Sequence, residues 1–414
     1  MPKPDLSRIE ELVKLLDHPE LTYPSIQITG TNGKTTTARA VTGMACAHGL
    51  TTGTFVSPHI ASVTERLTVC GAPIGEGEFG EEYERLLPYL LMVDDRVGPV
   101  SYFEALTALA FIWFADKPIG LGVFEVGMGG TWDATNVVRG DVAVLCPIGL
   151  DHMAVLGDTV AAIAAEKSGI VKEGRTAVVR QQSAAALRVI EERAGAVGAT
   201  LLLEDRDFAV EERTRAVGGQ VLRVRGRYAD YEDLVLPTYG EPAARNAAAA
   251  VVACEALLGR ELDPNAVREG LAGVVVPGRL EVVGRQPAAV LDGAHNPDAA
   301  AALAATLPEV FRWRTLHLVV GMFEDKDIDG VAAALAPLAP SAKAIATRPE
   351  GPRAAAAGRV AAALERAGFA EVSIAASVPE AVLAAREAAG DEDLILVTGS
   401  FYTVAGARPL FVGG

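Results

Sequence analysis

Short runs of β-branched and other apolar residues alternate with alanine-rich runs along almost all of the 414-residue sequence. This alternation is typical of parallel α/β folds, because a connection between parallel strands normally carries a helix. The first such segment predicts a strand at 25–29, a break at Gly30 and a helix over 34–48. We therefore expect an α/β protein built around a mostly parallel central sheet.

Later segments continue the pattern. A capping box over Ser101–Glu104 predicts the start of an apolar helix that ends near Ala115. Charged and aliphatic residues alternate over 204–236 around two adjacent glycines, which predicts an antiparallel hairpin insert. Further strands of the first series are expected at 52–56, 120–126 and 141–147.

A second series of strands and alanine-rich helices begins after the breaker Val276-Pro277-Gly278. The chain is longer than a common single domain, so a boundary is expected. We place it near this breaker, which gives one domain over 1–276 and a smaller domain over 277–414. The second series comprises expected strands near 280–284, 288–292, 315–321, 342–347 and 393–398.

The charge balance is acidic, with 37 Lys and Arg residues against 53 Asp and Glu residues and a formal net charge of −16. A broad nucleic-acid surface is therefore not expected, although a local basic pocket for an anionic ligand stays compatible with this balance. The longest stretch without a charged residue, 40–64, contains His, Pro and three glycines and indicates helix, turn and strand rather than a membrane span. The N-terminal residues predict an amphipathic helix. We expect a soluble, cytoplasmic protein.

Four cysteines are widely spaced and form no C-x-x-C pair, namely Cys46, Cys70, Cys146 and Cys254. In a cytosolic protein this pattern is typical of reduced thiols in or near the core. We expect no metal or redox role for them.

The most specific chemical signal is the segment ITGTNGKTT between the first strand and its helix. Glycines let backbone N–H groups approach phosphate oxygens, and a helix N-terminus adds positive potential. The lysine would reach the β- and γ-phosphates, while a threonine hydroxyl would bind Mg²⁺. A glycine-rich turn with an ordinary surface lysine is the alternative, but the flanking strand and helix favour a nucleoside triphosphate site. The loop residues are Gly30, Thr31, Asn32, Gly33, Lys34, Thr35 and Thr36.

Polar residues follow other strands of the first series. Glu125 ends one strand, and His152 follows the next. Ligands of open α/β sheets bind at the carboxyl ends of strands, so both are candidate Mg²⁺ ligands. Ser57 could complete the metal shell, and Arg66 could bind a carboxylate or form a surface ion pair. Glu166 and Lys167 are adjacent on a helix, which on composition alone indicates a solvated face.

Two turns of the second series carry similar residues. Asp292 and His295 follow a strand and precede a helix that begins with Pro297. Asp292 could bind ribose hydroxyls, and His295 could face a ligand or be a buried structural histidine. Ser400 and Tyr402 lie in the turn after another strand, which could also be an ordinary connection.

These segments together resemble the Mur ligase superfamily, and within it the folylpolyglutamate synthase/dihydrofolate synthase family. The matching segments occur in order as GTNGKTT, SPHIASVTERL, EVGMGGTWDATN, GLDHMAVLGDT, IAAEKSGIVK, PGRLE, DGAHNPDA, GMFEDKD and GSFYTVA. The resemblance implies an ATP-dependent ligase that joins L-glutamate to dihydropteroate, a reduced folate, or both, through an acyl phosphate. It implies a P-loop ATPase domain with a central, mostly parallel sheet over 1–276, joined to a smaller, Rossmann-like glutamate-ligase domain over 277–414. It also implies a monomer without nucleic-acid or membrane partners.

The resemblance carries roles to particular residues. The loop 30–36, Asn246, Arg279 and Asp292 would contact ATP. Lys34, Lys167 and His295 would act in catalysis. Two Mg²⁺ sites would use Thr35, Ser57, Glu125, His152 and a carbamylated Lys167. The glutamate would lie near Arg66, His295, Ser400 and Tyr402, and the pterin-side pocket would be shaped by Asp133, Ala134, Thr135 and Asn136.

Two departures from the family pattern are visible. Folate members usually carry H-Q where this chain has Pro242-Ala243, although Asn246 keeps its spacing. They also commonly carry GTNGKGS, whereas Thr35 and Thr36 are closer to the muramyl-peptide ligases. A muramyl-peptide ligase of cell-wall synthesis and a catalytically silent ATP-binding homologue are therefore the alternatives, and a nucleotide-dependent switch is a third.

Overall fold

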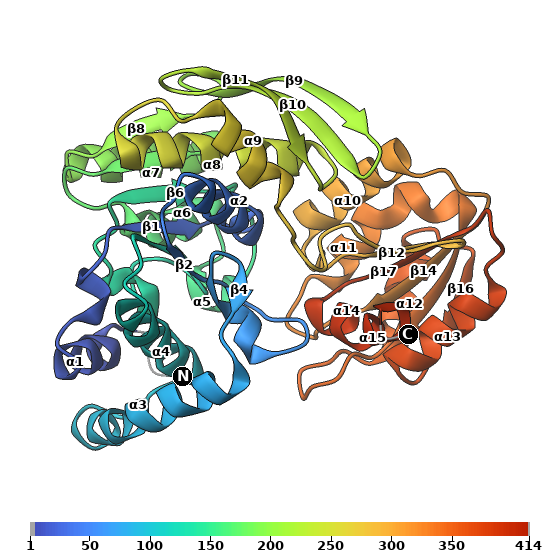
Figure 1. Ribbon diagram of the computed structural model, residues 1–414. Helices are drawn as coiled ribbons and strands as arrows, with labels where there is room; N and C mark the ends of the chain where they lie inside the picture. The colour runs from blue at the N-terminus through green and yellow to red at the C-terminus, as the bar shows by residue number, and fades with distance from the viewer. Residues whose placement is uncertain (1–4, 413–414) are drawn as a thin grey trace. The chain divides into compact units, whose positions relative to one another are not determined.

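The computed structural model describes residues 5–412, which form two compact units (Figure 1). The first comprises the chain up to Pro237 together with Pro242–Val275. The second comprises Thr238–Glu241 and the chain from Val276 onwards. Both are built on mostly parallel sheets, so the expected α/β class is confirmed.

An eight-stranded sheet forms the centre of the first unit, in the order β4-β3-β2-β5-β1-β6-β7-β8. All its pairs are parallel except β2·β3 and β3·β4. Strand β1 is buried throughout, as expected for a central strand between crossover helices. The strands are β1 (Ser25–Thr29), β2 (Thr52–Phe55), β3 (Leu67–Val69), β4 (Ala72–Pro73), β5 (Leu121–Glu125), β6 (Val142–Leu145), β7 (Thr176–Val179) and β8 (Thr200–Leu203).

Helices cover this sheet with two apolar clusters. One cluster joins α1, α3 and α4 to Phe55 and Phe124 of the sheet, and the other joins α6 and α7 to β6 and β7. Ser101 caps α4 as the capping box predicts. The helices are α1 (Ser7–Leu15), α2 (Lys34–Ala47), α3 (Glu76–Arg96), α4 (Tyr102–Asp116), α5 (Met153–Leu156), α6 (Val160–Lys167), α7 (Ala184–Ala196), α8 (Glu241–Leu258) and α9 (Pro264–Ala272). Short 3₁₀ turns are η1 (Pro19–Leu21), η2 (Val63–Arg66), η3 (Ala134–Val137) and η4 (Ser168–Ile170).

The predicted antiparallel insert is a separate three-stranded sheet, ordered β11-β10-β9 (Figure 1). Its strands are β9 (Ala209–Ala216), β10 (Gly219–Arg225) and β11 (Asp230–Leu236). The buried Glu255 on α8 accepts hydrogen bonds from the backbone N–H groups of Arg227 and Tyr228 and from the Tyr231 hydroxyl. This carboxylate therefore holds the β10–β11 turn against α8.

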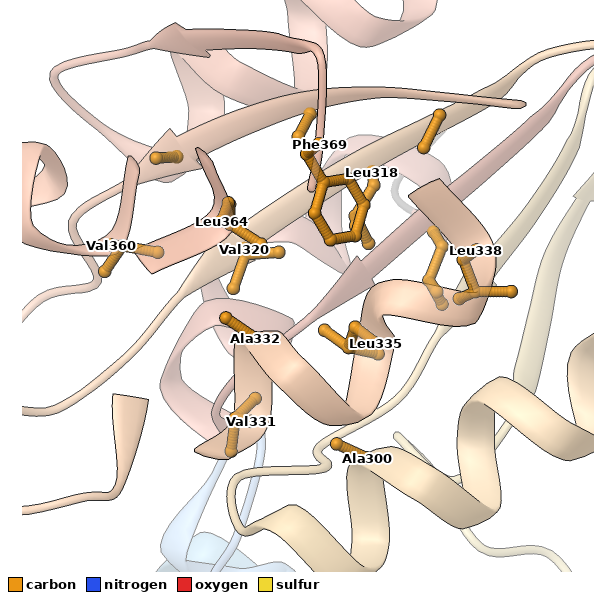
Figure 2. Close-up of a cluster of buried hydrophobic side chains, with 14 of the residues drawn as sticks. Ala300, Leu318, Val320, Val331, Ala332, Leu335, Leu338, Val360, Leu364 and Phe369 are labelled. Carbon is orange, nitrogen blue, oxygen red and sulfur yellow. The ribbon is translucent and has the colours of Figure 1, made fainter. Parts of the chain in front are cut away.

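The second unit has a six-stranded sheet in the order β12-β13-β17-β14-β15-β16, in which only β12·β13 is antiparallel. Figure 2 shows side chains of β14, α11 and α12 pointing toward one another in its core. The strands are β12 (Glu281–Arg285), β13 (Ala288–Leu291), β14 (Leu316–Gly321), β15 (Ala342–Thr347), β16 (Glu371–Ile374) and β17 (Leu394–Thr398). The helices are α10 (Pro297–Val310), α11 (Ile328–Leu335), α12 (Ala357–Arg366), α13 (Val378–Ala388), α14 (Phe401–Ala407), α15 (Pro409–Val412) and the 3₁₀ turn η5 (Ala336–Ser341).

The prediction of four reduced thiols is wrong for two of the cysteines. Cys46 and Cys70 form a disulfide, whereas Cys146 and Cys254 are free and buried. Cys46 lies near the end of α2 and Cys70 follows β3, which pairs with the strand after α2. The topology thus brings together two residues that are 24 positions apart. Within residues 5–412, no helix combines the length and apolarity that a membrane crossing requires.

Candidate active site

The glycine-rich loop leaves the carboxyl end of β1, between β5 and β6. Gly30 has φ +144°, and a Cβ there would lie 2.6 Å from Cβ of Cys146. Gly33 has φ +94°, and a Cβ there would lie 2.6 Å from Oδ1 of Asn246. Both positions therefore require glycine, because a side chain would be strained and would clash. The loop is held further by Thr31, whose N–H donates to the Pro147 carbonyl.

The helix that follows this loop has an open N-terminus. Gly33 is its N-cap residue and offers no side-chain cap, and its first turn contains no acidic residue. The first N–H groups of a helix lack intrahelical acceptors and carry partial positive charge. This end of α2 can therefore receive an anion without displacing a side-chain cap.

Two lysines converge on one carbonyl of the loop. Nζ of Lys34 and Nζ of Lys167 each donate to the Gly30 carbonyl at 3.0 Å. Lys167 is buried, and this burial, with the charge of Lys34, lowers its pKa to about 7. A phosphate group bound here would meet the Lys34 ammonium group and the open end of α2, so the arrangement fits a polyphosphate.

Glu125 ends β5 beside the loop and is buried. Its carboxylate accepts hydrogen bonds from Oγ1 of Thr35 at 2.9 and 3.0 Å and from the Ser57 N–H at 3.3 Å. The structure therefore brings three predicted metal-site residues together. Carboxylate and hydroxyl oxygens beside a polyphosphate suit Mg²⁺, which usually completes its shell with water and phosphate oxygens.

His152 follows β6 and is the N-cap residue of α5, with φ +51°. Its side chain is 40% exposed, and Nε2 lies 3.9 Å from Oδ2 of Asp151. Among residues 5–412, no three His, Cys, Asp or Glu side chains are grouped as a metal site. The residues described here thus supply a partial shell, and the predicted metal role of His152 stays a prediction.

Arg66 follows the cis Ser57-Pro58 segment at the end of η2. Its Nε donates to Nδ1 of His59 at 2.9 Å, and its guanidinium lies 5.6 Å from the centre of the Tyr102 ring. Burial and the Arg66 charge lower the pKa of His59. The Glu65 carboxylate accepts hydrogen bonds from the backbone N–H groups of residues 60–62.

The predicted pterin-side turn is stabilised by its own polar groups. Asp133 accepts hydrogen bonds from the N–H groups of Met128 and Thr135, and burial raises its pKa. Ala134 and Thr135 are buried in η3. Asn136 donates to the Thr131 carbonyl and accepts from Lys172. These contacts fix the shape of the turn.

In the second unit, Asp292 follows β13 and accepts hydrogen bonds from the N–H groups of Leu280 and Ala294. Burial raises its pKa, and the neighbouring Arg279 opposes that effect. The Arg279 guanidinium lies 4.4 Å from the centre of the Phe401 ring. His295 contacts the Gly293 carbonyl through Nδ1 at 2.8 Å. This unit therefore gathers predicted nucleotide- and glutamate-side residues around one turn.

Ser400 and Tyr402 lie at the start of α14. Oγ of Ser400 caps this helix by accepting the Thr403 N–H at 3.0 Å. Tyr402 is 49% exposed, and its ring meets Phe323 edge-on with centres 4.8 Å apart. The structure gives Ser400 a capping role, and a substrate contact for either residue stays a prediction.

Comparison with known proteins identifies the relationship. The profile of the "Mur ligase, glutamate ligase domain" family matches residues 278–401. A dihydrofolate synthase/folylpolyglutamate synthase of Mycobacterium tuberculosis is 41% identical over 99% of this chain and 90% of its own length. The chain belongs to the dihydrofolate synthase/folylpolyglutamate synthase family. The predicted family and ligase class are thereby confirmed.

Solved members of the family have the same fold. A folylpolyglutamate synthase of M. tuberculosis complexed with ADP and AMPPCP superposes with a TM-score of 0.94 at 40% identity, covering 99% of this chain and 96% of that one. An E. coli member in complex with DHPP and ADP gives a TM-score of 0.87 at 31% identity, covering 99% and 93%. Another bifunctional member was solved with Mn, AMPPNP and L-glutamate bound.

Two residues near the candidate site, Glu166 and Lys172, make hydrogen bonds that sequence analysis missed. The adjacent Glu166 and Lys167 predict a solvated helix face, but Glu166 is hydrogen-bonded within the protein. Its carboxylate accepts the N–H groups of Gly130 and Trp132, and its neighbour Lys167 is buried. Lys172 donates to both oxygens of Asn136, and burial lowers its pKa to about 8. No local pattern marks such residues, because their partners come from distant segments.

Proposed function

We propose that this chain joins L-glutamate to the carboxylate of dihydropteroate and of reduced folates at the expense of ATP, as a bifunctional enzyme. The observation that carries the proposal is the open N-terminus of α2, where Lys34 and Lys167 meet at the Gly30 carbonyl beside Glu125. Family membership supports the substrates, since relatives are named for both synthase activities and were solved with DHPP and with L-glutamate.

The loop 30–36 would hold the ATP phosphates. Its glycines leave the backbone N–H groups accessible, and Lys34 supplies a cation within reach of the same space. Transfer of the γ-phosphoryl group to the acceptor carboxylate would give an acyl phosphate and ADP. The Lys34 ammonium would stabilise charge on the transferring group by position and electrostatics. The glutamate amine would then attack the acyl carbon and release phosphate.

Thr35, Ser57, Glu125 and His152 would hold Mg²⁺, and a carbamylated Lys167 would add a carboxylate for a second ion. Such ions neutralise phosphate charge and orient the phosphoryl group. Relatives bound to Mn support a divalent cation. Intact-protein mass spectrometry in bicarbonate, with Lys167→Arg as control, would test the carbamate. No mass gain in the wild-type protein under native conditions would count against it.

The remaining predicted residues divide between the two units. Asn246, Arg279 and Asp292 would contact the nucleotide. Arg66, His295, Ser400 and Tyr402 would surround the glutamate, with Asp133 to Asn136 shaping the pterin-side pocket. We propose 1–276 as the ATP-binding domain and 277–414 as the glutamate-ligase domain, in a monomeric enzyme of the cytoplasm.

Product analysis tests the proposal. The protein would be incubated with ATP, Mg²⁺, L-glutamate and either dihydropteroate or tetrahydrofolate, and products identified by mass spectrometry. Glutamyl addition to both acceptors is expected. Addition to one acceptor alone would make the enzyme a dedicated synthase. ADP binding without a glutamyl product from either would overturn the assignment of folate substrates and favour a muramyl-peptide ligase or a silent homologue.

A further inference from the structure

A buried ion pair lies behind the phosphate loop. Nε of Arg180, which follows β7, donates to Oε2 of Glu204 at 2.9 Å, and the two side chains are 4% and 1% exposed. Glu204 also accepts the Gln181 N–H and a hydrogen bond from Arg245 at 3.3 Å. Burying a guanidinium costs folding free energy unless its N–H groups donate hydrogen bonds. Arg180 therefore needs a second acceptor besides Glu204.

That second partner is Asn246. Nη1 of Arg180 donates to Oδ1 of Asn246, which is itself buried on α8. A guanidinium can only donate, so this contact fixes which end of the amide is the oxygen. The remaining polar atom of the amide, Nδ2, is therefore a donor.

The same amide lies against the phosphate loop. A Cβ built on Gly33 would stand 2.6 Å from Oδ1 and 2.9 Å from Nδ2 of Asn246. Pro242 and Ala243, at the start of α8, have no side-chain hydrogen-bonding groups that could orient the amide from within the helix. Arg180, the residue after β7, supplies that orientation.

We propose that Arg180 is a positioning residue for nucleotide binding: it holds Asn246 so that Nδ2 donates to an acceptor atom of the nucleotide. Glu204 neutralises and aims the guanidinium. This inference rests on the proposed function only in that the loop binds a nucleotide. It does not depend on which carboxylate is the acceptor.

A double-mutant cycle on ADP binding tests the proposal. Calorimetric titration with ADP and Mg²⁺ would compare the wild-type protein with Arg180→Met, Asn246→Ala and the double variant. Each single change should raise the Kd for ADP about tenfold. The double variant should also raise it about tenfold rather than about a hundredfold, because both changes remove the same contact. The KM for ATP should rise by the same factor, with the KM for L-glutamate unchanged.

A matched control variant distinguishes a loss of stability from a loss of ADP affinity. Arg8→Met removes another guanidinium that bonds a buried carboxylate, that of Glu104. It should lower the unfolding midpoint without changing the Kd for ADP. Arg180→Lys keeps the positive charge, but a single ammonium group cannot donate to Glu204 and Asn246 with the planar geometry of a guanidinium. This variant should therefore fold and still bind ADP several-fold more weakly than the wild-type protein. If Arg180→Met does not fold, the cycle is run with Arg180→Lys.

Three results would overturn the positioning role: ADP affinity unchanged in the Arg180 variants, losses that multiply in the double variant, or Arg8→Met weakening ADP as much. A wild-type protein that binds ADP and forms no glutamyl product would overturn the proposed ligase instead, and the cycle would still decide the role of Arg180.

Discussion

The helices α2 and α10 share a plan of buried strand, tight turn and helix, yet their N-termini differ. α2 begins after Gly33 with no side-chain cap and no acidic residue in its first turn. α10 begins after Asn296, whose side chain accepts the Ala299 N–H, with Pro297 and Asp298 in its first turn. One helix end leaves its donors for a ligand, whereas the other is satisfied by the protein itself.

This difference suits the two turns to different ligands. An uncapped N-terminus with nearby lysines suits phosphate, because its N–H groups and dipole favour negative charge. A capped N-terminus beginning with Pro and Asp has one donor fewer and already carries an anionic side chain. The turn before α10 therefore offers fewer backbone donors to a ligand, and it carries the polar side chains of Asp292 and His295. Similar strand-turn-helix patterns in sequence can thus precede different chemistry.

Removing Lys34 should have the largest effect. Lys34→Ala should lower the rate of glutamyl product formation by at least about 10³-fold, because the transferring phosphoryl group loses its cation. Circular dichroism should stay native, since the side chain bonds only the loop carbonyls Gly30 and Thr31 in this structure. A natively folded variant that retains activity would refute the phosphate-loop assignment.

The other end of α2 is tied by the Cys46–Cys70 disulfide, and α10 has no such link. A cross-link spanning 24 residues should contribute about 3 kcal/mol to the free energy of unfolding. Reductant should therefore lower the unfolding midpoint of the wild-type protein and leave that of a Cys46→Ser/Cys70→Ser variant unchanged. Equal responses of the two proteins would show that the link does not constrain the chain.

Sequence analysis anticipated the strands that carry the site, because periodicity and turn residues are local. It placed the loop, Glu125 and Ser57 at neighbouring strand ends, and the structure joins them. It missed the disulfide and the hydrogen bonds of Glu166 and Lys172. Those contacts depend on which strands become neighbours, a property of the assembled sheet that no short segment encodes.

Gly33 permits a sharper test of the open helix end. Gly33→Ala places a Cβ 2.6 Å from the Asn246 amide at φ +94°, so we expect ADP binding to weaken about tenfold. Gly174 is a matched control, because it also has positive φ, +64°, but a Cβ there meets nothing within 4 Å. Gly174→Ala should cost about 1 kcal/mol of stability from backbone strain alone and leave ADP binding intact. Equal ADP affinities in the two variants would contradict a loop that contacts the nucleotide.

The smallest expected effect concerns the capped helix. Asn296→Ala removes the acceptor for the Ala299 N–H and should cost about 1 kcal/mol in urea denaturation. Asn296→Asp keeps a capping oxygen and adds negative charge at the helix N-terminus, so its free energy of unfolding should stay close to that of the wild-type protein. If Asn296→Ala and Asn296→Asp destabilise equally, the side chain does not act as a cap. The contrast with α2 would then rest on Pro297 and Asp298 alone, and the α10 end would have to be reconsidered as a second anion site.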